Sequence, residues 1–150
     1  MKNIITGIVA GALSFAAWGQ VSAGSEIENL SKGEYHYPDG QLPYRWFTPS
    51  DLVDNETYPL ILCLHGAGES GSDNETHVNK HDLVLPWIKE SNQKVNPCFV
   101  LAPQCPKGQK WNYIDFGQGS FSMDTLPVGT ELKAVIGLLD SLSGVYPIDQ

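Results

Sequence analysis

The chain has 150 residues and a hydrophobic fraction of 41%, which is enough for one modest domain with a core. Its formal net charge of -8 argues against a nucleic-acid partner, because phosphates recruit Lys and Arg. The acidic balance otherwise favours solubility and indicates no particular activity. No Cys and His residues have the spacing of a zinc site, and we expect no cofactor.

The N-terminus has the pattern of a signal peptide. Lys2 provides the positive charge, residues 4–18 are apolar, and residues 21–23 offer the small side chains that a signal peptidase needs. The alternative is a membrane anchor, but a span requires about 20 apolar residues and this segment has roughly 15. We expect cleavage after Ala23, export to the periplasm or the extracellular space, and no membrane contact afterwards. Residues 24–33 are then a polar leader, and residues 34–150 form the folded domain.

The first expected elements are strands. Two aromatic segments, residues 35–37 and 44–47, flank a Pro-Asp-Gly turn signal at residues 38–40, which predicts a β-hairpin at a sheet edge. A polar connection leads to the apolar run at residues 60–64. A short continuous apolar run is typical of a strand that is buried on both faces of a parallel sheet.

The second half of the chain predicts a helix, a strand and a longer helix. Residues 70–80 are polar and predict a surface loop, and residues 81–90 predict a short helix that Pro86 limits. Residues 99–102 predict a buried strand, and the aromatic residues of the long segment 104–127 favour an ordered wall. The clearest helix covers residues 130–142, where one apolar stripe contains Leu132, Val135, Ile136, Leu139 and Leu142. This order of elements predicts an α/β fold with a parallel sheet.

The strand at residues 60–64 ends in the sequence His65-Gly66-Ala67-Gly68-Glu69. Glycines directly after a buried strand allow the backbone to turn sharply and bring its N–H groups close to a ligand. A loop of this kind can stabilise a developing oxyanion. The motif therefore suggests acyl-transfer chemistry.

The chain contains three Cys residues, Cys63, Cys98 and Cys105. Export permits disulfides, but an odd number leaves at least one thiol unpaired within the chain. Cys98 and Cys105 could be bridged, although a straight strand between them would hold their Cα atoms beyond the limit of about 7 Å. We expect three free thiols.

Residues 44–149 resemble the N-terminal half of an α/β-hydrolase. More narrowly, they are similar to exported bacterial esterases of the dienelactone-hydrolase, feruloyl-esterase and polyhydroxyalkanoate-depolymerase kind, which include predicted peptidases and phospholipase/carboxylesterases. Three segments carry the likeness, at residues 58–74, 99–111 and 131–149. The resemblance implies a mostly parallel sheet with an N-terminal hairpin and the family's strand order 1-2-4-3-5-6-7-8. It also implies a serine esterase without a cofactor or a metal.

The resemblance further implies roles for individual residues. The backbone N–H of Ala67 would be one oxyanion donor, and Gly66 and Gly68 would allow the loop its geometry. His65 would brace the loop by hydrogen bonding and would not act as the base. For substrate contacts the candidates are Glu69, which could instead bond within the loop, and Trp111, which could instead only pack.

The chain departs from the family's pattern at the nucleophile. It contains no G-x-S-x-G elbow, and Ser70 lies in the wrong loop to replace it. In the family, the Ser, the acid and the His would all follow Gln150. We therefore expect an inactive fragment that is truncated before strand 5 and that exposes an apolar edge at residues 60–64, which lowers its solubility. The other His residues are expected at the surface: His36, His77 and His81.

Several functions are compatible with these patterns. The first is a serine hydrolase that acts on a carboxylic ester, either a small molecule or an acyl group linked to a polysaccharide. A prolyl-oligopeptidase-like peptidase is a close alternative, since the same triad cleaves amides. The second is a non-catalytic module that binds carbohydrate or a partner through the aromatic segment 111–121, and the third is a non-functional remnant.

Overall fold

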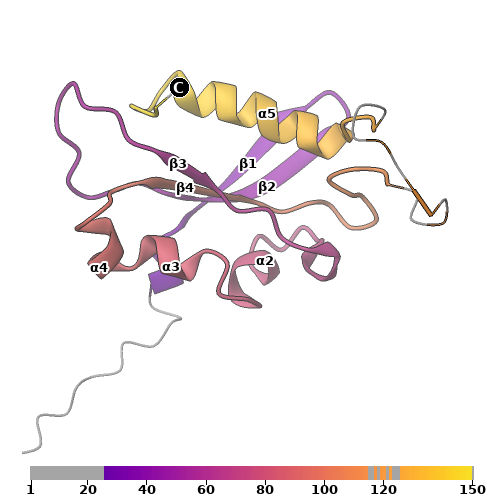
Figure 1. The fold of residues 1–150 in the computed structure, drawn as a ribbon, viewed down its shortest axis with the longest axis horizontal. Coiled ribbons are helices and arrows are strands. Elements are labelled where there is room, and N and C mark those ends of the chain that lie inside the picture. Colours follow the sequence, from indigo (N-terminus) through magenta and orange to yellow (C-terminus); the bar gives the residue numbers. More distant parts are fainter. Residues whose placement is uncertain (1–25, 115–116, 118, 121, 123–125, 150) are drawn as a thin grey trace, which may run out of the picture.

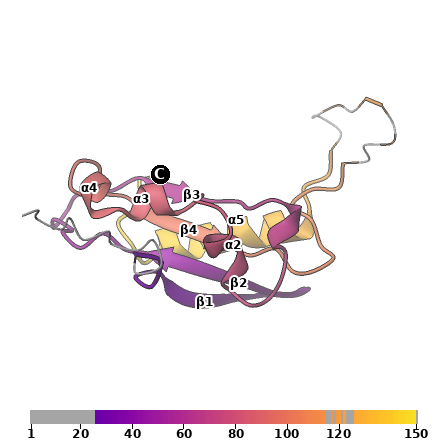
Figure 2. The same ribbon diagram turned by 90° about the horizontal axis from the view of Figure 1, so that it is seen from below.

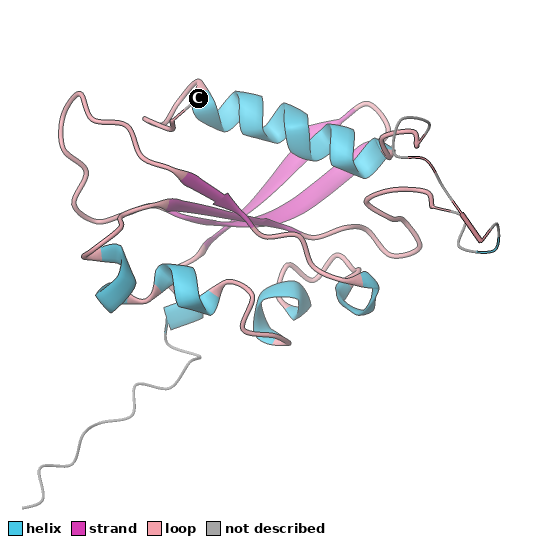
Figure 3. Ribbon diagram, in the orientation of Figure 1, coloured by secondary structure: helices cyan, strands magenta, loops and turns pink. Residues whose placement is uncertain are grey.

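The structure is a computed structural model, and it describes residues 26–114, 117, 119–120, 122 and 126–149. The predicted signal peptide lies outside these residues. A four-stranded sheet forms the centre, with helices on both faces (Figures 1 and 3). No helix within the described part of the chain is long and apolar enough to cross a membrane. The elements are β1 (Ser31–Tyr37), β2 (Gly40–Phe47), β3 (Leu60–Leu62), the 3-10 turn η1 (Ala67–Glu69), α2 (Thr76–Asn79), α3 (Leu85–Ile88), α4 (Glu90–Gln93), β4 (Phe99–Pro103) and α5 (Thr130–Ser143).

The strands have the order β1-β2-β4-β3. This is the order 1-2-4-3 that the family resemblance implies for its first four strands. The pairs β1–β2 and β2–β4 are antiparallel, and only β3–β4 is parallel. The prediction of an α/β fold is confirmed, whereas the prediction of a mostly parallel sheet is wrong for the described strands. The reason is that the hairpin contributes half of them.

The predicted hairpin is confirmed and is longer than its aromatic core. β1 and β2 pair from Ser31 with Trp46 to Tyr37 with Gly40, so Pro38 and Asp39 form the turn. The register places β1 at one edge of the sheet (Figure 2). The polar leader expected at residues 24–33 is wrong for its described part. Ile27 and Leu30 are buried in a core cluster, because the segment that enters β1 covers one face of the sheet.

Strand β4 is the most buried element, and every one of its residues is buried. Alternate side chains of a strand point to opposite faces. Accordingly, Val100 and Ala102 pack in the cluster formed with α3 and the loop before it, while Phe99 and Leu101 pack in the cluster formed with α5. The continuous apolar run therefore reflects a strand covered on both faces.

Strand β3 lies at the opposite edge from β1 and is shorter than the predicted strand. Its three residues, Leu60, Ile61 and Leu62, are only half-buried, so the prediction of a strand buried on both faces is wrong for them. Only β4 pairs with β3 among the described strands. Just before β3, Tyr58 forms an isolated parallel bridge with Ile148.

Helix α5 lies along one face of the sheet, opposite the short helices α2, α3 and α4 (Figure 1). The predicted stripe is right for Val135 and Leu142 and wrong for Ile136, which is 49% exposed. The buried face is centred on Ala134 and Leu138. Gly137 lies against the hairpin, since a Cβ there would lie 2.7 Å from the hydroxyl oxygen of Tyr35. The helix therefore approaches the hairpin closely on its small-residue side.

The short helices differ from the sequence predictions in extent. The polar loop at residues 70–80 contains α2, which the lack of apolar periodicity concealed. The helix expected at residues 81–90 divides into α3 and the start of α4. Pro86 lies in the first turn of α3, where its missing N–H costs no intrahelical hydrogen bond.

Candidate functional site

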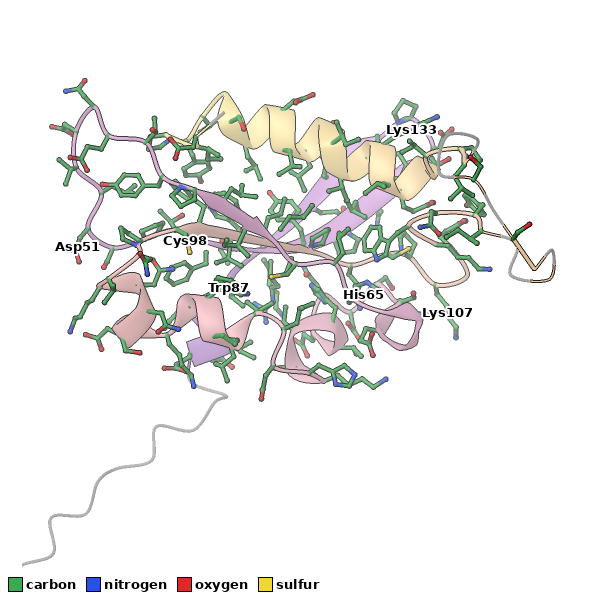
Figure 4. The ribbon with its side chains drawn as sticks, in the orientation of Figure 1. Asp51, His65, Trp87, Cys98, Lys107 and Lys133 are labelled. Carbon is green, nitrogen blue, oxygen red and sulfur yellow. The ribbon has the colours of Figure 1, made fainter. Side chains whose placement is uncertain are left out.

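The residues of the His-Gly-Ala-Gly-Glu motif lie just beyond the carboxyl-terminal end of β3. This is the edge of a parallel strand pair where ligands usually bind in α/β folds. Figure 4 shows His65 at this end of the sheet and Cys98 at the opposite end. The motif turns away from the sheet through Gly66, which has extended backbone geometry with φ of -80° and ψ of 177°.

His65 is buried, and both of its ring nitrogens meet backbone groups. Its Nε2 accepts the N–H of Cys105 at 2.8 Å, and its Nδ1 lies 2.6 Å from the carbonyl oxygen of Gly66. An acceptor nitrogen carries no proton, so the proton of the neutral ring is on Nδ1 and is donated to Gly66. These bonds tie the end of β3 to the end of β4 and leave no free ring nitrogen for proton transfer.

Trp111 covers His65 from the other side. Its Nε1–H donates to the carbonyl oxygen of His65 at 3.0 Å, and the two ring centroids are 5.3 Å apart. The backbone near Trp111 is held in turn by close packing, because a Cβ on Gly129 would lie 2.5 Å from its carbonyl oxygen. The expected wall is therefore ordered at this point, and Trp111 both packs and faces the pocket described below.

The two glycines of the motif serve close approach and not an unusual backbone conformation. Neither Gly66 nor Gly68 has a positive φ. A Cβ on Gly66 would lie 3.2 Å from Oε2 of Glu69, and a Cβ on Gly68 would lie 2.9 Å from Nζ of Lys80. The glycines thus leave room for two charged groups that pack against the loop.

The 3-10 turn η1 begins at Ala67, whose backbone N–H meets no acceptor among the described residues. The first N–H groups of any helical turn lack intrahelical partners. Within this turn, the N–H of Glu69 donates to the carbonyl oxygen of Gly66 at 3.3 Å. Ala67 is itself exposed, so its N–H is free for a ligand.

A pocket of about 330 Å³ is lined by Ala67, and its lining is mostly apolar. Ala67, Trp111 and Ile114 contribute apolar surface, while Gln109 and Lys110 lie at its polar side. A pocket of this size accommodates a small organic group. The remaining lining residues are His65, Gly66, Ser70, Cys105 and Asn112.

Glu69 does not line this pocket. Its carboxylate is buried, with Oε1 lying 3.1 Å from Nζ of Lys80 and 3.3 Å from Nε2 of His81. The hydrogen bond from Lys80, opposed in part by desolvation, lowers the pKa of Glu69 below its ordinary value. Of the two roles considered for Glu69, the structure places it in the loop and away from the pocket.

A buried glutamine, Gln104, connects the following loop to β4. Its Oε1 accepts the N–H of Asn74 at 2.7 Å, and its Nε2 donates to the carbonyl oxygen of Glu69 at 3.1 Å and to Oδ1 of Asp73 at 2.8 Å. Asp73 in turn accepts the N–H groups of Glu75 and Thr76 at the start of α2. The loop from η1 to α2 is therefore fixed by side chains that no local sequence pattern singled out.

His77 is also buried, so its predicted surface position is wrong. It lies on α2 with Nε2 at 2.9 Å from the carbonyl oxygen of Ala102, and its ring centroid is 5.9 Å from that of His65. Burial lowers its pKa to about 4. The sequence offered one sign of this burial: Val78, which is equally buried, lies next to His77 within an otherwise polar segment.

No complete nucleophilic site is present among the described residues. Ser70 lines the pocket, but His65 has no free nitrogen with which to accept its proton. Burial raises the pKa of the Cys105 thiol to about 11, which disfavours the reactive thiolate. All three Cys residues are free, as predicted. The part of the chain that the structure describes contains no group of three or more side chains that could hold a metal ion.

No family model matches the chain, and no curated protein sequence matches it. The chain is similar to a solved structure described as a thermostable esterase, with a TM-score of 0.73 and 34% sequence identity. The match covers 83% of this chain and 33% of that chain, so the chain spans about a third of the esterase's length.

The comparison and the strand order agree on the class of fold. The described residues form a mixed α/β sheet with helices on both faces, matching part of an esterase of this class. The likeness extends over most of the chain and therefore includes more than one of the three segments on which the family resemblance rests.

Proposed function

We propose that this chain forms the oxyanion-binding part of a serine hydrolase that acts on carboxylic esters. The observation that carries the proposal is the free backbone N–H of Ala67 beside an apolar pocket of about 330 Å³. The similarity to a thermostable esterase supports the reaction class. The bonds of His65 support a bracing role for it, because they hold the loop that presents Ala67.

In the proposed reaction, a serine oxygen bonds to the ester carbonyl carbon while a histidine takes the serine proton. The negative charge that develops on the carbonyl oxygen is stabilised by the N–H of Ala67 and by a second N–H next to the nucleophile. The alcohol then leaves with the proton from the histidine, and water releases the acid from the serine. The nucleophile, the base and the acid would be supplied by residues beyond those described.

The test removes one hydrogen-bond donor with little change of shape. The variant Ala67→Pro lacks the backbone N–H. Proline is suited to the first position of a helical turn, and the extended Gly66 has the geometry that a residue before proline prefers. The assay uses p-nitrophenyl acetate and the full-length protein, by which we mean this chain together with the residues that the proposal requires as nucleophile, base and acid. We expect kcat to fall about 100-fold or more while KM changes little.

The matched control is Ala67→Ser, which changes the side chain and keeps the N–H. We expect it to retain kcat within a few-fold of the wild type, on the order of a conservative surface change. Equal losses in both variants would mean that the side chain and not the N–H matters. A full-length protein that hydrolyses no ester would contradict the proposed function itself.

We further propose export as the cellular setting and an ester of a small molecule or of a polysaccharide as the substrate. The pattern of residues 1–23 supports export. The apolar wall formed by Trp111 and Ile114 supports binding of the acyl group. Parallel assays with an ester and with the matching amide distinguish the esterase from the peptidase alternative, since a peptidase must turn over both.

A further inference from the structure

Lys80 reaches from α2 to the 3-10 turn that presents the proposed oxyanion donor. Its Nζ donates to the carbonyl oxygen of Gly68 at 3.2 Å and lies 3.1 Å from Oε1 of Glu69. Gly68 and Glu69 are the second and third residues of this turn, directly after Ala67. One ammonium group therefore holds both residues that follow the donor.

The partner of Lys80 is the carboxylate of Glu69, which is much more deeply buried than Lys80 itself. The Glu69 side chain is only 6% exposed, whereas the Lys80 side chain is 48% exposed. The lysine hydrogen bond keeps the pKa of Glu69 below its ordinary value, so the carboxylate is charged at neutral pH. A buried charged carboxylate requires such a partner.

The backbone of Lys80 is also held in place. It follows α2 directly, and its backbone N–H donates to the carbonyl oxygen of Thr76. Helix α2 is anchored at its start by Asp73 and along its length by the buried His77. Lys80 therefore links an anchored helix to the 3-10 turn.

The absence of side chains on the two glycines fits the same arrangement. A Cβ on Gly68 would lie 2.9 Å from Nζ of Lys80, which is closer than a real Cβ contact allows. A Cβ on Gly66 would lie 3.2 Å from Oε2 of Glu69. Neither glycine has a positive φ, so a side chain at either position would displace this ion pair and would not strain the backbone.

We propose that Lys80 is a positioning residue that fixes the direction of the Ala67 N–H through Gly68 and Glu69. The proposal rests on the proposed function, because it assigns that N–H to the oxyanion. The Lys80 side chain is 48% exposed, and His81 remains as a second partner of the Glu69 carboxylate when Lys80 is replaced. The effect of Lys80 is therefore local to the turn, and it can be separated from an effect on folding.

The experiment labels the full-length protein with nitrogen-15 alanine. The experiment follows the signals of the three Ala residues that lie within residues 24–150, namely Ala67, Ala102 and Ala134. Ala102 in β4 and Ala134 in α5 are buried and act as internal references for the fold. The Ala67 signal is identified by its loss in the variant Ala67→Ser.

In Lys80→Met, we expect the Ala67 amide signal to move and its hydrogen exchange to accelerate about tenfold, because opening of the turn becomes easier. The signals of Ala102 and Ala134 should stay in place. Lys80→Arg should restore the wild-type Ala67 signal. The control is Lys94→Met, which removes an exposed ion pair of 2.6 Å with Glu90, far from the turn in sequence, and should change none of the three signals.

Two spectral outcomes would overturn the proposal. One is an Ala67 signal that Lys80→Met leaves unchanged, or that Lys94→Met alters as much. The other is a wild-type Ala67 signal at the position of an unfolded chain, since the turn would then not be held. Neither outcome depends on turnover, so they are distinct from failure of the proposed function.

A kinetic measurement tests the consequence of the positioning. With p-nitrophenyl acetate, Lys80→Met should lower kcat about tenfold with KM almost unchanged, because the oxyanion contact strengthens in the transition state. Lys80→Arg should recover most of that loss. An unchanged kcat in Lys80→Met would overturn the role in positioning. Absence of any hydrolysis by the wild type would overturn the proposed function, and the spectra alone would then test whether Lys80 positions Ala67.

Discussion

His65 and Cys105 are joined by a hydrogen bond in which the backbone N–H of Cys105 donates to Nε2 of His65 at 2.8 Å. Both residues are buried, so water cannot replace either partner without rearrangement. The bond connects the loop after β3 with the chain leaving β4. Two neighbouring parallel strands therefore hold their ends together through a side chain, and this end carries the candidate site.

The first prediction concerns removal of that side chain. His65→Ala leaves the N–H of Cys105 buried without an acceptor and removes the packing of the ring against Trp111. We expect a loss of about 3 kcal/mol in the free energy of unfolding, measured with urea on the full-length protein. The control is His36→Ala, since the His36 side chain is 73% exposed. Equal losses in both variants would contradict the bracing role.

A second prediction concerns Asn74, which has a positive φ of 55°. Its Nδ2 donates to the carbonyl oxygens of Gly33 at 3.1 Å and Tyr44 at 3.0 Å, joining the loop before α2 to both strands of the hairpin. Asn74→Asp tolerates the same backbone conformation but places a carboxylate against two carbonyl oxygens. We expect a loss of about 2 kcal/mol or more in the free energy of unfolding.

Asn55 provides the matched control for this change. It has a similar φ of 64° but is exposed, and its side chain donates no hydrogen bond among the described residues. Asn55→Asp should therefore change the free energy of unfolding by less than about 0.5 kcal/mol. If both variants changed the free energy of unfolding by the same amount, the hydrogen bonds of Asn74 would make no net contribution to stability.

The sequence predicted those parts of the fold that repeat a local pattern. The hairpin followed from aromatic segments around a turn, and β4 followed from its apolar run. Helix α5 followed from its period, but its rotation did not. Ile136 lies within the apolar period yet is exposed, whereas the neighbouring Gly137 lies against Tyr35. The helical period contains no information about which residues of the sheet the helix will meet.

The parts of the site that sequence reasoning missed depend on contacts between distant residues. Gln104 bonds to the N–H of Asn74, 30 positions away, and to the carbonyl oxygen of Glu69, 35 positions away. His77 bonds to a carbonyl oxygen 25 positions away. A polar residue in a polar segment gives no local sign of burial, since its partners become visible only when the strands are adjacent. The His-Gly-Ala-Gly-Glu motif could be found because its two glycines lie close together in sequence, directly after an apolar strand.

A third prediction concerns the thiols. Burial raises the pKa values of Cys63 and Cys105 to about 11, and it also raises the pKa of Cys98. Because the thiolate is the reactive form, these Cys residues should react with Ellman's reagent at least about 100-fold more slowly in the folded protein than in concentrated guanidinium chloride. Rapid labelling of Cys105 under folded conditions, located by mass spectrometry, would show that the chain leaving β4 opens easily.

The last prediction concerns the dependence of stability on pH. His77 is 2% exposed, and burial lowers its pKa from 6.5 to about 4. The unfolded chain therefore binds the proton more tightly than the folded one. The stability that the neutral ring permits is fully present above about pH 6.5 and is lost as the pH falls towards about 4, by about 3 kcal/mol in total.

In His77→Gln the loss of stability between about pH 7 and about pH 4.5 should be smaller by most of that amount, as measured by urea unfolding at each pH. His36→Gln, at an exposed position, should keep the wild-type dependence. Parallel pH profiles for the wild type and His77→Gln would mean that His77 gains a proton in the folded protein as easily as in the unfolded chain, which its burial against Ala102 forbids.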